Sequence, residues 1–132
     1  MADIESHTVN EEQYFASSRV GDFELSIDST GEDGPTPNET LVAAYASCYT
    51  AAFRAGGQRV HDVDVGRLEI EAEASLDEDD DLADIAFTLH VEADLDDELA
   101  GAMVETGDDI CHVHAAVREG LHADVDVVAD AF

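Results

Sequence analysis

The chain has 132 residues, of which 33 are acidic and only five are basic, so its formal net charge is −28. A field of that sign repels phosphate backbones and anionic membrane surfaces, which argues against nucleic acids and membranes as partners. Because 45% of the residues are hydrophobic, we expect the acidic residues to form the solvated surface of a packed fold rather than a disordered chain.

The length fits one domain, spanning residues 1–132, whose core would gain from a partner subunit. The chain has no stretch apolar enough for a membrane span, and its first residues, MADIESHTVNEE, lack the basic and apolar regions of a signal peptide. We therefore expect a cytoplasmic protein. All five basic residues are arginines, and an acidic chain without lysine resembles the proteins of extreme halophiles, because molar salt shortens the Debye length to about 3 Å.

The N-terminal segment is predicted to form strands. Residues 22–28 alternate between polar and apolar side chains, which indicates a strand with one buried face. Residues 8–17 are a weaker strand candidate, and Gly21-Asp22 would make the turn between the two. The composition of residues 31–35 predicts a loop.

A long helix is predicted next. The run Thr36-Pro37-Asn38-Glu39 combines an N-cap threonine, a proline at the first helical position and a glutamate that completes a capping box. The segment 41–53 carries no charge, so we expect this helix to be buried on all sides, with Cys48 near its middle and Gly56-Gly57 as its stop.

Two more strands are predicted after the helix. In the segment 63–72 the apolar residues occupy odd-numbered positions before Gly66 and even-numbered positions after it. This change indicates a bulge or a bend at Gly66. The acidic run 77–81 is predicted to be a hairpin loop. In the next strand the inward positions are Ile85, Phe87, Leu89 and Val91.

The last third is predicted to hold two helices and a strand. The first helix is predicted to begin at Asp96 and its acidic neighbours and to end at Gly107. The second is predicted to be capped by Asp108-Asp109 and to end at Gly120. In the final strand Val125 and Val127 face inward. The predicted order is β-β-α-β-β-α-α-β, an α+β fold.

The two cysteines are the candidate reactive groups. Intracellular compartments keep thiols reduced, so a permanent bridge is not expected, and either a reactive pair or two buried thiols remains. Cys111 falls in the first turn of a predicted helix, where exposed amides and the helix dipole favour a thiolate. Free cysteine is also a common small hydrophobe in protein cores, which is the competing interpretation for both.

Two motifs carry a resemblance to a known family. The run from Pro37 to Cys48, PNETLVAAYASC, and the run from Cys111 to Gly120, CHVHAAVREG, resemble the two cysteine helices of the OsmC/Ohr family. The resemblance extends over the whole order of elements. It implies antiparallel sheets packed around a long buried helix that carries the first cysteine, in an intertwined homodimer whose active site is lined by both subunits.

The resemblance implies a thiol-dependent peroxidase without cofactor or metal. Cys48 would attack an organic hydroperoxide and become a sulfenic acid, and Cys111 would condense with it to a disulfide that a dithiol reductant opens. A buried thiolate needs a partner that stabilises its charge. The family uses an arginine from the N-terminal strands and a glutamate near the helix start as these partners. Glu39 matches the glutamate of the motif, and Arg19 is assigned as the arginine because it is the only one before Cys48.

Two further expectations concern the surroundings of the cysteines. His112 stands where the family commonly has proline, which changes the backbone beside the second cysteine. A preference for organic hydroperoxides is expected because apolar side chains are predicted to surround Cys48, namely Leu41, Tyr45, Tyr49 and Phe53.

Two other functions remain open from the sequence. Cys111, His112 and His114 could bind a metal, with His61, His90 and His122 elsewhere, although a second closely spaced ligand pair is missing. His112 is then expected at the surface and His114 at a helix interface. A noncatalytic module that binds an apolar ligand beside Cys48 is the other alternative.

Overall fold

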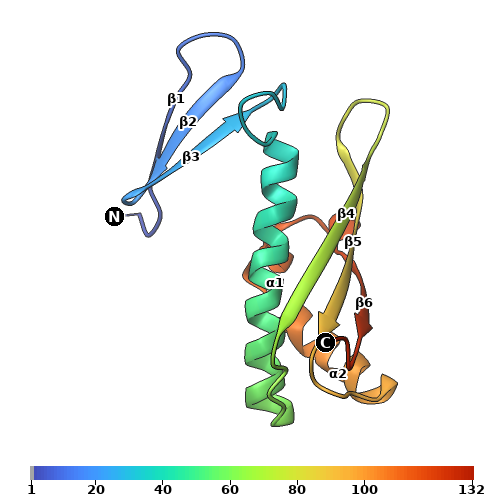
Figure 1. Ribbon diagram of the computed structural model, residues 1–132. Coiled ribbons are helices and arrows are strands. Elements are labelled where there is room, and N and C mark those ends of the chain that lie inside the picture. Colours follow the sequence, from blue (N-terminus) through green and yellow to red (C-terminus); the bar gives the residue numbers. More distant parts are fainter. Residues whose placement is uncertain (1) are drawn as a thin grey trace. The chain divides into compact units, whose positions relative to one another are not determined.

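The computed structural model describes residues 2–132, which form two compact units, one ending at Leu41 and the other running from Val42 to Phe132. In chain order the elements are three strands, a long helix, two strands, two helices, a 3₁₀ turn and a last strand, and Figure 1 colours them along the sequence. The α+β class is confirmed. The observed order contains one strand more than the sequence predicted.

The first unit contains an antiparallel sheet of β1 (Ser6–Val9), β2 (Phe15–Val20) and β3 (Phe23–Asp28). The prediction of one strand over residues 8–17 is wrong, because this segment contains the end of β1, a turn and the start of β2. Gln13 in that turn has a φ of 55°, which an extended strand does not allow. The turn predicted at Gly21-Asp22 is confirmed, and Gly21 adopts a φ of 60°.

Helix α1 (Pro37–His61) begins with the predicted capping box. The Thr36 hydroxyl accepts the N–H of Glu39 at 3.1 Å, and the Glu39 carboxylate accepts the N–H of Thr36 at 2.9 Å. The predicted stop at Gly56-Gly57 is wrong. A Cβ on Gly56 would lie 2.8 Å from Cγ2 of Thr106, so this glycine permits close packing against the next long helix.

Within the single chain, α1 is not buried on all sides. Its buried positions repeat at helical spacing on one side, whereas Ala43, Ala44, Ser47 and Ala51 are exposed. On the buried side the ring of Phe87 lies 4.8 Å from that of Tyr45, edge to face, and 5.5 Å from that of Tyr49. This aromatic contact fixes the rotation of α1 on the sheet of the second unit.

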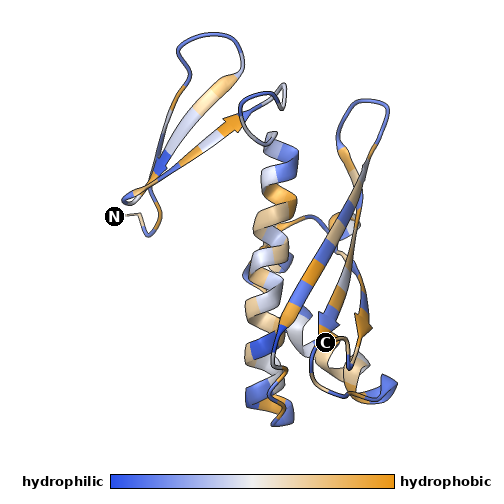
Figure 2. Cartoon of the chain, in the orientation of Figure 1, coloured by the Kyte–Doolittle hydropathy of each residue, from blue (hydrophilic) through white to orange (hydrophobic). Residues whose placement is uncertain are grey.

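The sheet of the second unit has the order β4 (Leu68–Leu76), β5 (Leu82–Val91), β6 (Asp124–Val128). Figure 2 shows alternating hydrophilic and hydrophobic bands along β4. The inward positions predicted for β5 are all buried, and Val125 and Val127 of β6 are partly buried, as predicted. The expectation of wholly antiparallel sheets is wrong here, because β6 runs parallel to β5 after the helical crossover.

The predicted bend at Gly66 is confirmed, since its φ is 70°. The segment before it, which contains Val63 and Val65, is not a strand, and β4 begins only at Leu68. A Cβ on Gly66 would lie 2.6 Å from the Glu92 carboxylate, so both the turn and the close approach require glycine.

The helices that follow β5 are α2 (Asp97–Ile110), the short α3 (His112–Ala116) and a 3₁₀ turn, η1 (Glu119–Leu121). The predicted stop at Gly107 and cap at Asp108-Asp109 are wrong, because α2 continues through them. Gly107 faces the Tyr49 hydroxyl, to which a Cβ would lie 3.3 Å away, so packing explains this glycine. The predicted end at Gly120 is wrong as well, since α3 ends at Ala116.

None of the helices formed by residues 2–132 has the length and apolarity needed to cross a membrane.

The acidic surface has few cationic partners. Arg67 pairs with Glu69 at 2.6 Å, and His90 lies 3.5 Å from the carboxylate of Glu71. Two further arginines donate to backbone carbonyl oxygens instead, Arg54 to Gly66 and Arg118 to Leu82. Most of the carboxylates therefore repel one another, and this repulsion is limited mainly by screening.

We predict that stability falls as salt is removed. Transfer from molar potassium chloride to about 0.05 M lengthens the Debye length several-fold and strengthens the repulsion between carboxylates in the compact state. Thermal unfolding followed by circular dichroism should show a clearly lower midpoint in dilute salt. A midpoint that stays constant over this range would contradict the expected halophilic character.

Candidate active site

Cys48 lies on α1 at the edge of the face that packs on the sheet. It is half-buried, and it belongs to the partly buried apolar side chains that border the core. Tyr45, Tyr49 and Phe53 are fully buried in the core itself. Cys48 packs against the apolar core that these rings help to form, and the rings of Tyr45 and Tyr49 lie on the side of α1 that faces β5.

Cys111 is the junction between α2 and α3. Its φ and ψ of −66° and 114° are non-helical, its N–H donates to Gly107 at the end of α2, and its sulfur accepts the N–H of His114 in α3 at 3.4 Å. Cys111 is thus the N-cap of α3, close to its predicted position in the first turn. Only 1% of its surface is exposed.

The two cysteines, far apart in sequence, are free thiols that lie close enough for a hydrogen bond between their side chains to shift the pKa of both. Burial raises the pKa of the Cys48 thiol, but three hydrogen bonds to its sulfur outweigh burial, so that this pKa lies below its ordinary value. The donors are the N–H of Val113, the thiol of Cys111 and the N–H of His112.

Cys111 behaves in the opposite way. Burial raises the pKa of the Cys111 thiol, and both its hydrogen bond to Cys48 and the negative charge on Cys48 raise it further. The N–H groups of His114 and Val113 offset only part of this. The expectation of a partly ionised Cys111 is therefore wrong in direction: its amides are present, but burial beside another thiolate outweighs them. Cys48 ionises first and Cys111 donates to it.

A polar group that the sequence analysis missed lies beside the thiols. The hydroxyl of Tyr45 accepts the N–H of Ala123 at 3.0 Å and lies 2.5 Å from Nδ1 of His114. The imidazole of His114 is stacked on that of His122, with ring centroids 3.9 Å apart. His112 is exposed and His114 lies at the helix interface, both as predicted. The available signal was spacing, since Tyr45 precedes Cys48 by as many residues as Cys111 precedes His114.

The other two predicted site residues belong to the first unit. Glu39 lies in the first turn of α1, where its carboxylate closes the capping box. Arg19 is exposed on β2 and has His7 and Glu24 as its cross-strand neighbours. The thiols lie in the second unit, and the donors that lower the pKa of Cys48 come from the second unit alone.

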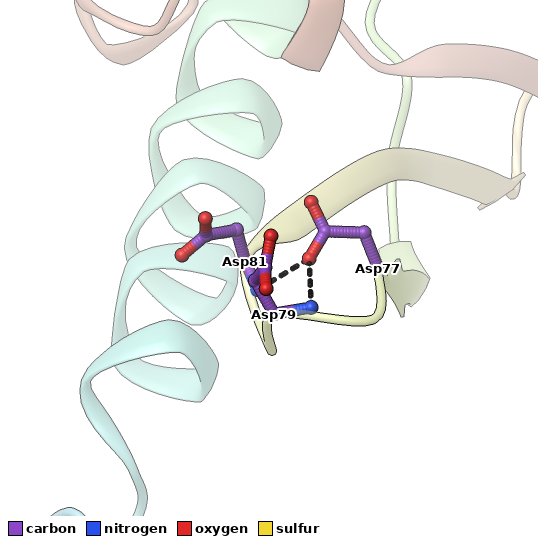
Figure 3. A group of neighbouring side chains, drawn as sticks. All are labelled: Asp77, Asp79 and Asp81. Carbon is purple, nitrogen blue, oxygen red and sulfur yellow. Dashed lines mark hydrogen bonds between the residues drawn. The ribbon is translucent and has the colours of Figure 1, made fainter.

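The ligand geometry does not favour the Cys/His metal site. We asked which three or more His, Cys, Asp or Glu side chains of residues 2–132 have ligand atoms close enough to share an ion. Only Asp77, Asp79 and Asp81, in the β4–β5 hairpin, meet this condition, and the predicted Cys/His group does not. Figure 3 shows the Asp77 carboxylate accepting the backbone N–H groups of Asp79 at 2.8 Å and Asp81 at 3.0 Å. These bonds close the predicted hairpin loop and account for the aspartate at position 77.

Comparisons with known proteins agree with this architecture. An uncharacterized protein of the halophilic archaeon Haloferax volcanii is 52% identical over the full length of both chains. An OsmC-like protein of Mycoplasma pneumoniae has a TM-score of 0.83 at 14% identity, with 97% of each chain covered. The organic hydroperoxide resistance protein OhrB of Bacillus subtilis has a TM-score of 0.74 at 18% identity, with 96% of this chain and 98% of that chain covered.

A family model described as OsmC-like protein matches residues 29–126, a stretch that includes α1, both cysteines and the sheet of the second unit. The match covers most of the chain, and the chain therefore belongs to the OsmC-like family.

Proposed function

We propose that this protein is a thiol-dependent peroxidase that reduces organic hydroperoxides with Cys48 as the attacking thiol and Cys111 as the resolving thiol. The observation that carries the proposal is the contact between two free thiols whose pKa values are displaced in opposite directions. Family membership and the similarity to a hydroperoxide resistance protein support it.

In the first step the Cys48 thiolate attacks the outer oxygen of the hydroperoxide. The O–O bond breaks, the sulfur becomes a sulfenic acid, and the alkoxide leaves and takes a proton to become an alcohol. The lowered pKa and partial exposure of Cys48 both favour this role, because the thiolate is the nucleophile and must meet its substrate.

In the second step the sulfur of Cys111 attacks the sulfenic sulfur, and water leaves as the disulfide forms. A neutral sulfenic acid no longer repels a second thiolate. Two of the influences that raise the pKa of Cys111, the hydrogen bond and the charge of Cys48, would then be lost. Oxidation of Cys48 is thus expected to prepare Cys111 for its own reaction.

Backbone amides are central to the proposed stabilisation of the thiolate. The N–H of Val113 and that of His112 both donate to Cys48. We retain Arg19 and Glu39 as the proposed charged partners on the basis of the family motif. In this arrangement they would add to the amides, which already lower the pKa of Cys48 within the second unit.

An apolar hydroperoxide is the proposed substrate. Like Cys48, other partly buried apolar side chains pack against the core, among them Val42, Ala46, Val113 and Val117. Burying the carbon chain of a substrate against such residues is favourable by roughly 25 cal/mol per Å². Hydrogen peroxide has no apolar part and gains nothing from this surface.

We propose that the cycle is completed by a dithiol reductant in the cytoplasm, where thiols are kept reduced. We also propose that residues 1–132 act as one OsmC-like domain within a homodimer. Support comes from apolar side chains left exposed in the first unit, such as Phe23 at 76% and Tyr14 at 65%, and from the exposed alanines on α1. Exposed apolar side chains of this kind support the proposed interface between subunits, where they would be covered.

Replacing His112 tests the amide contribution. The change His112→Pro removes one N–H donor, and proline fits this position because it is the first residue of α3 and follows a residue in the extended region. The pKa of Cys48 should rise, and alkylation of Cys48 at neutral pH should slow by roughly tenfold. His112→Ala keeps the N–H and is the matched control. Equal alkylation rates in the two variants would contradict the assignment.

Peroxidase activity tests the function itself. In molar salt with an excess of dithiol, the wild type should turn over cumene hydroperoxide faster than hydrogen peroxide, and Cys48→Ser should abolish turnover. Cys111→Ser should consume one equivalent to form sulfenic acid on Cys48 and a second to form sulfinic acid, because the proposed resolving thiol is absent. Turnover retained in Cys48→Ser would refute the mechanism.

The oligomeric state tests the proposed homodimer. Sedimentation in molar potassium chloride should give a mass of about twice the 14.1 kDa of the chain. Phe23→Asp places a charge on the exposed apolar surface and should shift the equilibrium toward the monomer. A wild type that sediments as a monomer would contradict an active site lined by two subunits.

A further inference from the structure

Two side-chain contacts join α1 to the segment formed by Cys111 and α3, and they have the same spacing on both elements. One is the thiol contact between Cys48 and Cys111. The other is the contact between the Tyr45 hydroxyl and Nδ1 of His114, 2.5 Å apart. Tyr45 lies three residues before Cys48 and His114 three residues after Cys111, so the second contact lies one helical turn away from the first.

We propose that Tyr45 and His114 are a positioning pair that holds Cys111 against Cys48 for the step that forms the disulfide. The proposal rests on the proposed function for its role in catalysis. The structural claim concerns only the approach of one sulfur to the other.

The direction of the hydrogen bonds follows from the donors available. The Tyr45 oxygen accepts the N–H of Ala123, and its single proton then points to Nδ1 of His114. Burial raises the pKa of Tyr45, so this hydroxyl keeps its proton. His114 must be neutral and unprotonated at Nδ1 to accept it. One hydroxyl thereby ties together α1, α3 and the segment that enters β6.

This tie is important because α3 is short. The five residues from His112 to Ala116 include no fully buried side chain. An isolated helix of this length has no stability of its own. The cap made by the Cys111 sulfur, 3.4 Å from the backbone nitrogen of His114, is weak because a thiol sulfur is a weak acceptor. Without the bond to Tyr45, the N–H groups that donate to Cys48 still connect α3 to α1, but Cys111 is held less firmly against Cys48.

The protonation of His114 makes the tie sensitive to pH. The groups that face His114 are Tyr45 on α1, Asp108 and Asp109 on α2, and His122 after η1. Burial lowers the pKa of His114, the two aspartates raise it, and His122 lowers it, with a lowered pKa as the result. His114 is therefore neutral at physiological pH, and the bond to Tyr45 is lost only under acidic conditions.

The test uses the purified full-length protein in molar salt and 4,4′-dithiodipyridine as an aromatic disulfide oxidant. The Cys48 thiolate attacks this disulfide, which forms a mixed disulfide and releases one thiopyridone. Cys111 then loses its proton and attacks the Cys48 sulfur, which forms the protein disulfide and releases the second thiopyridone. The absorbance of thiopyridone reports the two rates separately, and no peroxidase activity is needed.

Tyr45→Phe and His114→Ala should slow the second release more than the first, by roughly tenfold in the ratio of the two rates, the scale of one lost buried hydrogen bond. Some slowing of the first release is expected as well, because N–H donors to Cys48 come from α3. Tyr45→Phe keeps the ring that packs on Phe87. His114→Asn should restore the second rate, because the amide oxygen occupies the position of Nδ1 and accepts the same proton. Tyr49→Phe is the matched control, since it removes a hydroxyl of the same helix that bonds to α2 instead.

The pH profile supplies a second readout. The ratio of the wild-type to the His114→Asn second rate should fall by up to roughly tenfold at acidic pH, as His114 becomes protonated and the asparagine does not. A second rate in Tyr45→Phe equal to that of the wild type would overturn the proposal. So would equal slowing in His114→Asn and His114→Ala. If Tyr45→Phe does not fold, the two His114 variants still decide.

Failure of the proposed function gives a different result. A wild type that consumes no hydroperoxide, but whose second thiopyridone rate depends on Tyr45 and His114 as described, would refute the peroxidase and retain the positioning pair.

Discussion

The packing of Tyr45 and Tyr49 around Phe87 is the constraint on which the site depends. These rings lock the rotation of α1 against β5, and a helix with a fixed rotation gives every other residue a fixed direction. Cys48 then lies at the border between the packed face and the exposed face. A thiol at such a border can contact Cys111 on the protein side while remaining open to a substrate on the other.

The way in which the Cys48 thiolate is stabilised suits a protein of this charge. Long-range repulsion from a net charge of −28 disfavours an additional anion, but in molar salt this repulsion decays over about 3 Å. The N–H groups of Val113 and His112 act by direct contact, at a range where salt screens little. A chain with only five arginines can thus lower the pKa of a thiol through its backbone.

Local sequence signals predicted the local features well. The capping box at Thr36 and Glu39 and the alternation along β5 were recovered because each depends on neighbours in sequence. The predictions based on glycine were wrong. Gly56 and Gly107 were interpreted as helix stops, but both lie inside helices and allow close packing between α1 and α2. Only tertiary contacts reveal that purpose. The pairing of Tyr45 with His114 left only its equal spacing from the two cysteines as a signal, and that spacing has meaning only once the cysteines are known to lie together.

The opposite displacement of the two thiol pKa values bears on the choice between a reactive pair and two cysteines that merely fill space. Burial alone would raise the pKa of both thiols. Burial does raise the pKa of Cys111, but at Cys48 the hydrogen bonds reverse its effect. A packing role gives no reason for three donors to converge on one sulfur. The same reasoning disfavours a simple apolar ligand module, which would require the surface beside Cys48 but no difference between the two thiols.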